Sequence, residues 1–213
     1  TSSSTPPVQR VRSDAHRLSW VPLVPGVVEM LSSWDGAVSS FGEDVRWAPL
    51  TFVFVLASTW FVKWPLIVAA GCACDATRKR LPRATVAAVL AVTTAAMFVT
   101  LLKDLFDRAR PSVADPGLNP IGLVPASASF PSGHAATAFA AAVAIALIYP
   151  RLGRPLLVLA AVVALSRVYL GVHYVLDVAV GTLLGIAVGI AAAWVVTAVA
   201  RSPRERATSP ARL

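Results

Sequence analysis

Three short polar clusters interrupt a chain whose other segments are strongly apolar, and they hold residue types that can bind and attack an anion. The clusters are Lys103–Pro111 (KDLFDRARP), Phe130–His134 (FPSGH) and Ser166–Asp177 (SRVYLGVHYVLD). They supply cations, a serine beside a glycine, two imidazoles and a carboxylate. Several cations and hydrogen-bond donors around one imidazole suit the binding and transfer of a phosphoryl group.

The spacing within the first and third clusters predicts that their ionisable groups share a face. Lys103 and Arg110 are seven residues apart, so a helix that continues through the cluster would present both cations on one side. His173 and Asp177 are four residues apart, so on a helix the carboxylate would hold the imidazole in one tautomer and orientation. A base held by an orienting carboxylate is typical of an activated nucleophile.

The second cluster comes directly before an apolar segment and predicts the start of a helix. Ser132 is a good N-cap, and Gly133 lets a ligand approach the backbone. Unpaired N–H groups at a helix start form an anion site. His134 lies beside them and can act as general acid on a leaving oxygen. The sequence has no carboxylate cluster typical of Mg²⁺ and no Cys/His set typical of zinc, so it predicts phosphoryl transfer through a phosphohistidine with no metal and no cofactor.

Each of these residues also has an ordinary structural explanation. A single Lys or Arg near a span end usually extends to the lipid headgroups, a lone His is often a hydrogen-bonded surface residue, and Asp177 alone could cap a helix. However, two of the three His, three cations and the only acid between Pro116 and Arg204 fall on one predicted side. Because ionisable groups at membrane depth are costly and usually functional, this coincidence favours an anion-handling site.

The composition indicates a membrane protein. The chain has 213 residues, of which 56% are hydrophobic and 14% charged, whereas soluble domains carry about 25% charged residues. The net charge of +8 comes mostly from Lys and Arg between or after apolar runs, so topology explains it better than nucleic acid. Two cysteines, Cys72 and Cys74, cannot form a disulfide framework. These features exclude a soluble enzyme, a disulfide-rich secreted scaffold and a DNA-binding domain.

Apolar segments predict an all-α integral membrane helical bundle with about five transmembrane helices and an N-terminal interfacial amphipathic helix over residues 24–41. The five spans are Pro49–Cys72, Ala84–Leu102, Ala135–Tyr149, Leu156–Val172 and Val178–Ala200. The last span carries a stripe of glycines at four-residue steps that predicts close helix packing: Gly181, Gly185 and Gly189.

The domain organisation follows from these segments. Residues 1–19 are rich in Ser, Thr and Pro and are predicted to be a disordered tail with no cleavable signal peptide. Residues 20–200 form a single membrane domain, and residues 201–213 form a basic cytoplasmic tail.

The basic residues orient the predicted bundle, because cytoplasmic loops are enriched in Lys and Arg. Ten of them fall in three segments that alternate onto one side: Arg78, Lys79, Arg80, Arg83, Arg151, Arg154, Arg201, Arg204, Arg206 and Arg212. The connection over residues 103–132 and the turn near His173 then face outward. The sequence therefore predicts a multi-pass plasma-membrane protein whose site lies at the extracytoplasmic face, with an outer N-terminus if there are five spans.

Taken together, the three clusters resemble the signature of the type 2 phosphatidic acid phosphatase superfamily, which includes the vanadium haloperoxidases and bacterial acid phosphatases. The resemblance rests on Lys103-x6-Arg110-Pro111, Pro131-Ser132-Gly133-His134 and Ser166-Arg167-x5-His173-x3-Asp177, in order and at the expected spacings. It implies a helical bundle, usually of six membrane helices in integral members. It also implies phosphate binding by Lys103, Arg110, Ser132, Gly133 and Arg167, with His173 as nucleophile, Asp177 as its partner and His134 as leaving-group acid. The membrane-like spans argue against the haloperoxidase branch.

The sequence thus predicts a membrane lipid phosphatase that acts on a lipid phosphomonoester or a polyprenyl diphosphate, without nucleic acid as a partner. Phosphatidic acid, phosphatidylglycerol phosphate, polyprenyl diphosphate and polyprenyl-phosphoribose phosphate all remain open as substrates, because the signature reads only the phosphate. The oligomeric state is also open. The alternatives are a lipid phosphotransferase with the same site and a non-catalytic lipid-phosphate binding or transport protein. The 16 arginines against three lysines are consistent with a high-GC bacterial genome.

Several charged residues fall outside this interpretation. Lys63 lies near the middle of the first predicted span, where it either reaches water beside a kink at Pro65 or lines a path by which lipid reaches the site. Asp104, Asp107 and Arg108 are predicted to form solvated loop pairs that contribute little to stability.

Overall fold

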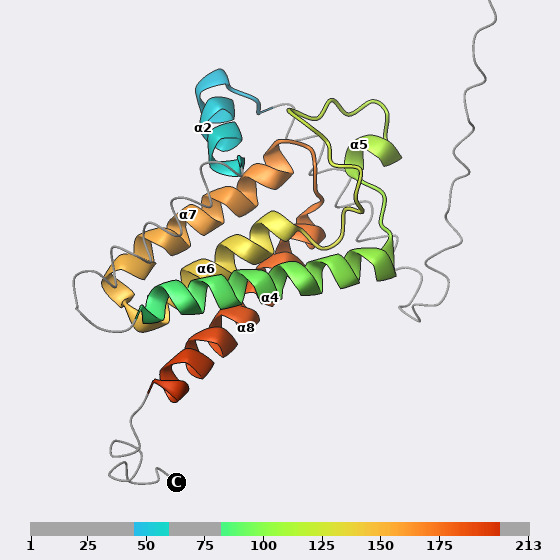
Figure 1. The fold of residues 1–213 in the computed structure, drawn as a ribbon. Helices are drawn as coiled ribbons and strands as arrows, with labels where there is room; N and C mark the ends of the chain where they lie inside the picture. Colours follow the sequence, from blue (N-terminus) through green and yellow to red (C-terminus); the bar gives the residue numbers. More distant parts are fainter. Residues whose placement is uncertain (1–44, 60–81, 201–213) are drawn as a thin grey trace, which may run out of the picture. The chain divides into compact units, whose positions relative to one another are not determined.

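The computed structural model describes residues 45–59 and 82–200, and its regular secondary structure there is entirely helical (Figure 1). The helices are α2 (Ala48–Ser58), α4 (Arg83–Phe106), α5 (Pro111–Ala114), α6 (Gly133–Ile148), α7 (Pro150–Tyr169) and α8 (Val175–Val199). The all-α prediction is confirmed for this part of the chain. The predicted tails over 1–19 and 201–213, the interfacial helix over 24–41, Lys63 and the two cysteines lie outside the described residues.

Within the described residues, three segments are long and apolar enough to cross a membrane. They are Arg83–Ala114, which contains α4 and α5, together with α7 and α8. Helices α2 and α6 are apolar but shorter. The described helices therefore include three to five candidate membrane helices. Of the predicted span Pro49–Cys72, only the part that forms α2 lies within the described residues.

Two helices end where the backbone enters the left-handed region. Helix α4 stops at Asp107, whose φ is 40° and whose N–H donates to the carbonyl of Lys103 at 2.9 Å. Helix α7 stops before Gly171, whose φ of 71° is a conformation that glycine adopts without strain. The same helix starts earlier than predicted, because a proline such as Pro150 is tolerated in the first turn, where the backbone N–H has no partner in the helix. Helix α4 therefore ends within the first polar cluster, and helix α7 ends within the third.

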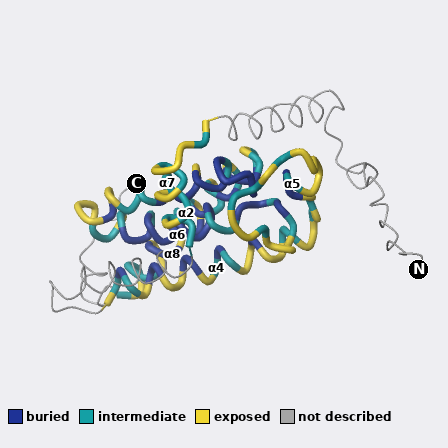
Figure 2. Tube along the Cα trace, turned by 90° about the horizontal axis from the view of Figure 1, so that it is seen from above, coloured by how far each residue is buried: buried dark blue, intermediate teal, exposed yellow. Residues whose placement is uncertain are grey.

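Helix α6 packs against α4, α7 and α8. One of its contacts is a cluster of small buried residues shared with α4 and α8, made of Ala87, Ala91, Ala95, Ala140, Ala144, Val188 and Ala192. Small side chains let helix backbones approach closely, which is how helices associate in a membrane. Figure 2 shows buried and exposed positions alternating along α4. Exposed positions on the bundle are also apolar, as at Val158, Leu183 and Trp194, which is typical of helices that face lipid.

The predicted glycine stripe lies at the contact between α8 and α6. A Cβ added to any of the three glycines would approach an α6-side carbonyl oxygen more closely than 3.0 Å; the pairs are Gly181 with Ser132, Gly185 with Ala136, and Gly189 with Ala140. The packing role predicted for this stripe is confirmed.

Helix α2 supports the end of α7 that leads into the third polar cluster. The hydroxyl of Tyr169 accepts the Trp47 N–H at 2.9 Å and lies 2.9 Å from the Thr51 hydroxyl. The Phe54 ring packs edge-on against Tyr169, with 4.8 Å between the ring centroids. These contacts fix the last turn of α7, which carries Arg167.

Candidate active site

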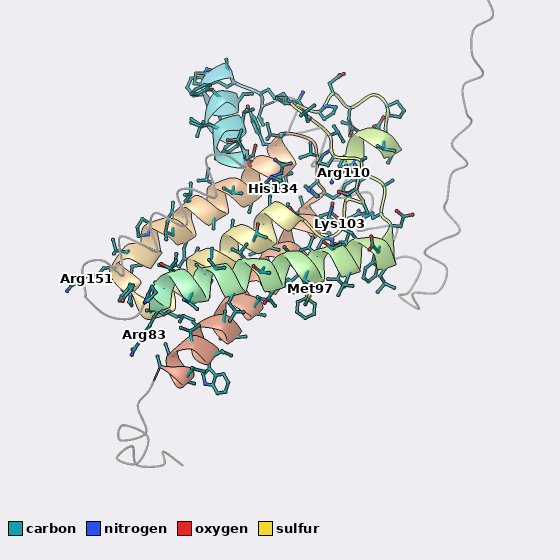
Figure 3. The ribbon with its side chains drawn as sticks, in the orientation of Figure 1. Arg83, Met97, Lys103, Arg110, His134 and Arg151 are labelled. Atoms are coloured by element: carbon teal, nitrogen blue, oxygen red, sulfur yellow. The ribbon has the colours of Figure 1, made fainter. Side chains whose placement is uncertain are left out.

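The three polar clusters meet at one end of the bundle. This end holds the C-terminal ends of α4 and α7 and the N-terminal ends of α6 and α8. Figure 3 shows Lys103, Arg110 and His134 at this end and Arg83 and Arg151 at the opposite end. At that opposite end, the Arg83 guanidinium donates to the carbonyl of Ala200 at 3.2 Å. The fold therefore separates Lys103 and Arg110 from Arg83 and Arg151, two of the basic residues that were used to predict topology.

The start of α6 is joined directly to the start of α8. The Ser132 N–H donates to the backbone carbonyl of Asp177 at 2.9 Å. The Ser132 hydroxyl accepts the N–H of Ala135 at 3.5 Å, so the predicted N-cap is confirmed. Gly133 follows, and a Cβ there would lie 3.3 Å from a methyl carbon of Val99 on α4. The second cluster is thus held between α4 and α8.

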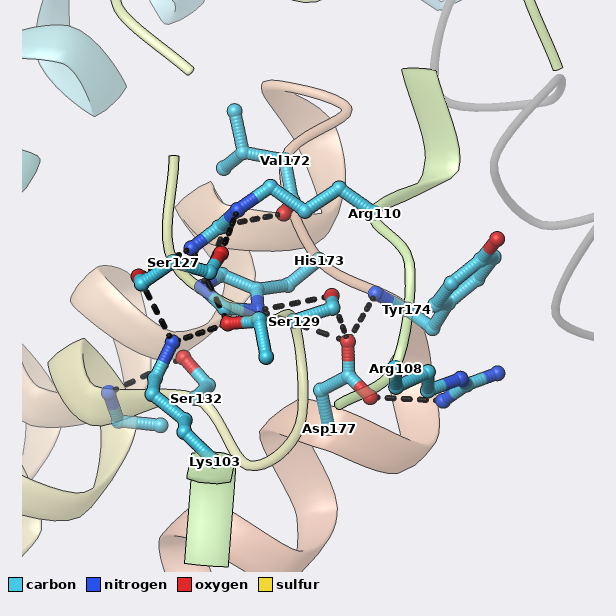
Figure 4. A network of polar contacts seen from close by, with 12 residues as sticks. Lys103, Arg108, Arg110, Ser127, Ser129, Ser132, Val172, His173, Tyr174 and Asp177 are labelled. Carbon is cyan, nitrogen blue, oxygen red and sulfur yellow. Dashed lines mark hydrogen bonds and ion pairs between the residues drawn. The ribbon is translucent and has the colours of Figure 1, made fainter. Parts of the chain in front are cut away.

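His173 lies in the connection between α7 and α8 and is buried, with 2% of its surface exposed. Its backbone N–H donates to the backbone carbonyl of Arg167 at 3.2 Å, in the turn that contains Gly171. Its Nδ1 lies 3.5 Å from Asp177 Oδ2, and its Nε2 lies 3.3 Å from Nη1 of Arg110 (Figure 4). The predicted contact with Asp177 is present, although His173 precedes α8 and does not lie on its face.

The Asp177 carboxylate is fully buried and accepts hydrogen bonds from several segments. Its Oδ2 accepts the Tyr174 N–H at 3.0 Å and the Ser129 hydroxyl at 2.5 Å. Its Oδ1 accepts from Arg108 at 2.6 Å. The carboxylate therefore caps the first turn of α8 and also lies against the imidazole of His173.

Lys103 and Arg110 converge, but not on one helix face as the seven-residue spacing predicted. Helix α4 ends at Phe106, and Arg110 lies in an extended stretch before α5. Both cations instead reach the segment Ser127–Ala128. The Lys103 ammonium donates to the Ala128 carbonyl and to the Ser127 hydroxyl, the latter at 3.3 Å. Arg110 donates to the Ser127 carbonyl at 2.9 Å and the Val172 carbonyl at 2.8 Å.

Arg167 and His134 complete the set of predicted site residues. Arg167, in the last turn of α7, is buried, and its Nε has no hydrogen-bond partner within residues 45–59 and 82–200. A buried guanidinium with an unused N–H is a suitable donor for an anion. His134 lies in the first turn of α6 and is half-buried.

Two residues of the site were missed by sequence reasoning. Ser129 is fully buried, and its hydroxyl lies 3.4 Å from Nδ1 of His173 while it donates to Asp177. The prediction that Arg108 forms a solvated loop pair is wrong, because Arg108 binds Asp177. The available signal was Asp177 itself: a single acid in a long apolar region needs a cation, and Arg108 lies only two residues before Arg110.

The pKa of the His173 imidazole is lowered to about 4, mainly by burial and also by the nearby charges of Arg110 and Arg167, against the opposing effect of Asp177. The imidazole is therefore neutral near pH 7, with one N–H and one lone pair. Because Asp177 and Ser129 face Nδ1, we assign the proton to Nδ1 and the lone pair to Nε2, which faces Arg110. This arrangement presents a nucleophilic nitrogen to an anion held by cations.

The model of the PAP2 superfamily matches residues 84–201. The chain belongs to the PAP2 superfamily. The matched region contains all three polar clusters and the helices from α4 to α8, so the resemblance seen in the motifs is confirmed over more than half of the chain.

Individual proteins with similar sequences match this chain over about half of its length or less. The bacitracin transport permease protein BcrC of Bacillus licheniformis is 35% identical over 50% of this chain and 53% of its own length. The decaprenylphosphoryl-5-phosphoribose phosphatase of Mycobacterium tuberculosis is 46% identical over 42% of this chain and 48% of its own length. The chain therefore spans about half the length of the curated relatives that it matches.

A solved PAP2 structure matches the fold more completely. The transmembrane PAP2 type phosphatidylglycerolphosphate phosphatase from Bacillus subtilis superposes with a TM-score of 0.62 and 25% identity, over 89% of this chain and 90% of that chain. Together with the three helices that are long enough to cross a membrane, this likeness identifies an integral, multi-pass membrane protein of the PAP2 superfamily.

Proposed function

We propose that this PAP2 protein is a lipid phosphatase that hydrolyses a lipid phosphomonoester or a polyprenyl diphosphate through a phosphohistidine. The observation that supports this most directly is the position of His173, whose Nε2 lies 3.3 Å from the Arg110 guanidinium while its Nδ1 faces Asp177. Two similar proteins carry names that describe phosphatases of lipid phosphates, one with a decaprenylphosphoryl-5-phosphoribose substrate and one with phosphatidylglycerolphosphate.

The proposed first step is displacement at phosphorus. Lys103, Arg110 and Arg167, with the N–H groups at the start of α6, bind the phosphate and neutralise its charge. The Nε2 lone pair of His173 forms a bond to phosphorus as the bond between phosphorus and the lipid oxygen breaks. His134 gives a proton to the departing oxygen. The imidazole becomes positively charged, and the Asp177 carboxylate stabilises that charge through Nδ1.

In the second step, water replaces the lipid. His134, now neutral, takes a proton from the water as its oxygen bonds to phosphorus and the bond to Nε2 breaks. Inorganic phosphate leaves, and His173 returns to its neutral form. A lipid or sugar hydroxyl in place of water would make the protein a phosphotransferase.

The test is phosphate release from a panel of lipid phosphates by the purified protein in detergent. We expect His173→Ala to abolish release and to leave a folded protein, because the imidazole contributes little buried apolar area. Asp177→Asn should lower kcat by about 10²- to 10⁴-fold, since it removes the orienting charge. His16→Ala, the same change in the predicted tail, is the matched control. Near-normal turnover in His173→Ala would contradict the phosphohistidine mechanism.

A second candidate function is a non-catalytic lipid-phosphate binding or transport protein, which the transport name of the Bacillus licheniformis relative favours. Such a protein would bind a lipid phosphate with the same cations but would release no phosphate. Wild-type protein that retains a labelled lipid phosphate without hydrolysing any member of the panel would support this alternative. Labelled phosphate appearing on an added alcohol would support the phosphotransferase.

We further propose that the site faces the extracytoplasmic side of the plasma membrane. The support is the placement of Arg83 and Arg151 at the end of the bundle opposite Lys103 and Arg110. In a Cys72→Ser, Cys74→Ser background, Asn119→Cys should react with a membrane-impermeant thiol reagent in intact cells. Arg154→Cys, at an exposed position near the other end, should react only after permeabilisation. The reverse pattern would place the site in the cytoplasm.

A further inference from the structure

Arg108 forms an ion pair that the signature of the superfamily and the mechanism above leave unused. Its Nη1 lies 2.6 Å from Oδ1 of Asp177, whose side chain is 0% exposed, while the Arg108 side chain is 25% exposed. The same guanidinium lies over the ring of Tyr174, with 3.9 Å between its carbon and the ring centroid. Arg108 therefore connects the surface of the site to its buried carboxylate.

The two oxygens of Asp177 have different partners, and this division fixes the carboxylate. Oδ2 receives the Ser129 hydroxyl at 2.5 Å and the Tyr174 N–H at 3.0 Å, and it faces Nδ1 of His173 at 3.5 Å. Oδ1 receives Arg108. A carboxylate can rotate about its terminal bond, and a buried oxygen without a donor costs free energy. The guanidinium on Oδ1 therefore opposes any rotation that would take Oδ2 away from His173.

The two arginines of the first cluster lie on opposite sides of one imidazole (Figure 4). Arg110 reaches Nε2 of His173 directly, on the side where the phosphate is proposed to bind. Arg108 reaches the Asp177 carboxylate, which faces Nδ1. Both arginines lie in the short stretch between the end of α4 and the start of α5, outside either helix.

We propose that Arg108 is a positioning residue for the phosphatase reaction, which acts through Asp177 to hold His173 for attack. This proposal rests on the proposed function of the same site. Arg108 keeps Asp177 ionised and oriented, so that the positive imidazole formed in the first step meets a carboxylate in place. The Tyr174 ring holds the guanidinium plane by a cation–π contact, which a lysine ammonium at this position would reproduce less well.

The test compares Arg108→Gln and Arg108→Lys with the wild type, on whichever lipid phosphate the wild type hydrolyses. For Arg108→Gln, we expect kcat to fall on the order of 10- to 100-fold while KM changes by less than about threefold, since the interaction lost acts in the transition state. Arg108→Lys should recover part of kcat, because it restores the charge. Arg151→Gln, the same substitution at an exposed arginine far from the site, should leave activity unchanged.

A double-mutant cycle separates action through Asp177 from an independent role. In an Asp177→Asn background, Arg108→Gln should cost less than about threefold in kcat, because the partner it orients has lost its charge. Equal losses in both backgrounds would overturn the proposal. So would a tenfold or larger rise in KM with kcat kept, because Arg108 would then bind the phosphate itself.

A readout that does not need turnover keeps this proposal distinct from the proposed function. Nitrogen-15 NMR of histidine-labelled protein, with His173→Gln to assign the signal, should show the Nδ1–H tautomer in the wild type and a mixture of tautomers in Arg108→Gln. If the wild type hydrolyses nothing but this change occurs, the proposed function fails and the positioning role stands. An unchanged His173 signal in a folded Arg108→Gln protein would overturn the positioning role.

Discussion

The Ser132 N–H donates to the backbone carbonyl of Asp177 at 2.9 Å, and this bond joins the starting turns of α6 and α8. Ser132 lies at the start of α6, where the phosphate is proposed to bind, and Asp177 contacts the proposed nucleophile His173. One turn further along α8, a Cβ on Gly181 would lie 2.5 Å from the Ser132 carbonyl oxygen. The distance between the start of α6 and the proposed nucleophile His173 therefore depends on Gly181 having no side chain.

We therefore expect Gly181→Ala to reduce both stability and activity. The added methyl group must push α8 away from Ser132, and overpacking of this kind costs about 1–3 kcal/mol. The thermal midpoint and phosphate release in detergent measure the two effects. Ala179→Val adds bulk to α8 at an exposed position and is the control. A Gly181→Ala protein with wild-type midpoint and turnover would show that this contact does not set the site geometry.

Ser129→Ala should lower kcat with little change in KM. The Ser129 hydroxyl donates to Asp177 and lies 3.4 Å from Nδ1 of His173, so its oxygen can accept a hydrogen bond from the Nδ1–H while it holds the carboxylate. Loss of such a buried hydrogen bond costs about 1–3 kcal/mol, which corresponds to roughly a 5- to 150-fold fall in rate. Ser112→Ala on α5 is the matched control. A rise in KM alone would instead indicate that Ser129 contacts the substrate.

Local features of this site could be predicted from the sequence, and long-range ones could not. The pairing of His173 with Asp177, the N-cap at Ser132 and the packing of Gly181 each depend on residues a few positions apart in the sequence or on a simple repeat. The spacing of Lys103 and Arg110 correctly predicted that the two cations converge, but the single helix face that it assumed is absent. The helix stops at Asp107 in the left-handed region, and the two cations meet through Ser127 and Ala128.

The contacts of Arg108 and Ser129 with Asp177 depend on the path of the connection between α5 and α6. That path is fixed by tertiary contacts, such as the Ser129 N–H to the Arg108 carbonyl at 2.7 Å and the Ile121 N–H to the Leu170 carbonyl at 3.0 Å. No periodic pattern marks these contacts, so propensity and spacing do not reveal them. A single acid in a long apolar region needs a cation, but several cations were equally available in the sequence.

Arg167→Lys should weaken substrate binding although it keeps the positive charge. The Arg167 side chain is buried, and its Nε is without a hydrogen-bond partner within the described part of the chain, as expected for a donor reserved for an anion. A lysine offers one point charge in place of a planar fork of donors. We expect KM to rise about 10- to 150-fold, the equivalent of one charge-assisted hydrogen bond of about 1.5–3 kcal/mol. Arg154→Lys at an exposed position is the control, and an unchanged KM would remove Arg167 from the phosphate site.

His173 should stay neutral well below the pH at which an ordinary histidine takes up a proton. Burial lowers the pKa of its imidazole to about 4, whereas an unperturbed imidazole with a pKa near 6.5 would be only about one-tenth neutral at pH 5.5. A lowered value means that the neutral form persists as pH falls, so the nucleophile is not lost between pH 7 and 5. Nitrogen-15 NMR should show the neutral His173 signal throughout this range, with His173→Gln to assign it. A titration centred near pH 6.5 would contradict the burial argument.

Activity should survive removal of divalent metal ions and should be inhibited by vanadate. Lys103 and Arg110 converge on one segment beside His173, and Arg167 is buried in the turn that precedes it, so protein cations can offset the phosphate charge. Vanadate adopts the trigonal-bipyramidal shape of the phosphoryl transition state, and analogues of that state bind about 10²- to 10⁸-fold more tightly than substrate. We therefore expect turnover of a soluble, metal-free short-chain lipid phosphate to be unchanged in excess EDTA and lost at vanadate concentrations far below KM. A metal-dependent phosphatase treated in parallel is the control for chelation. Loss of turnover in EDTA that added Mg²⁺ restores would show that the cations of this site do not suffice, and the phosphohistidine mechanism would need a metal.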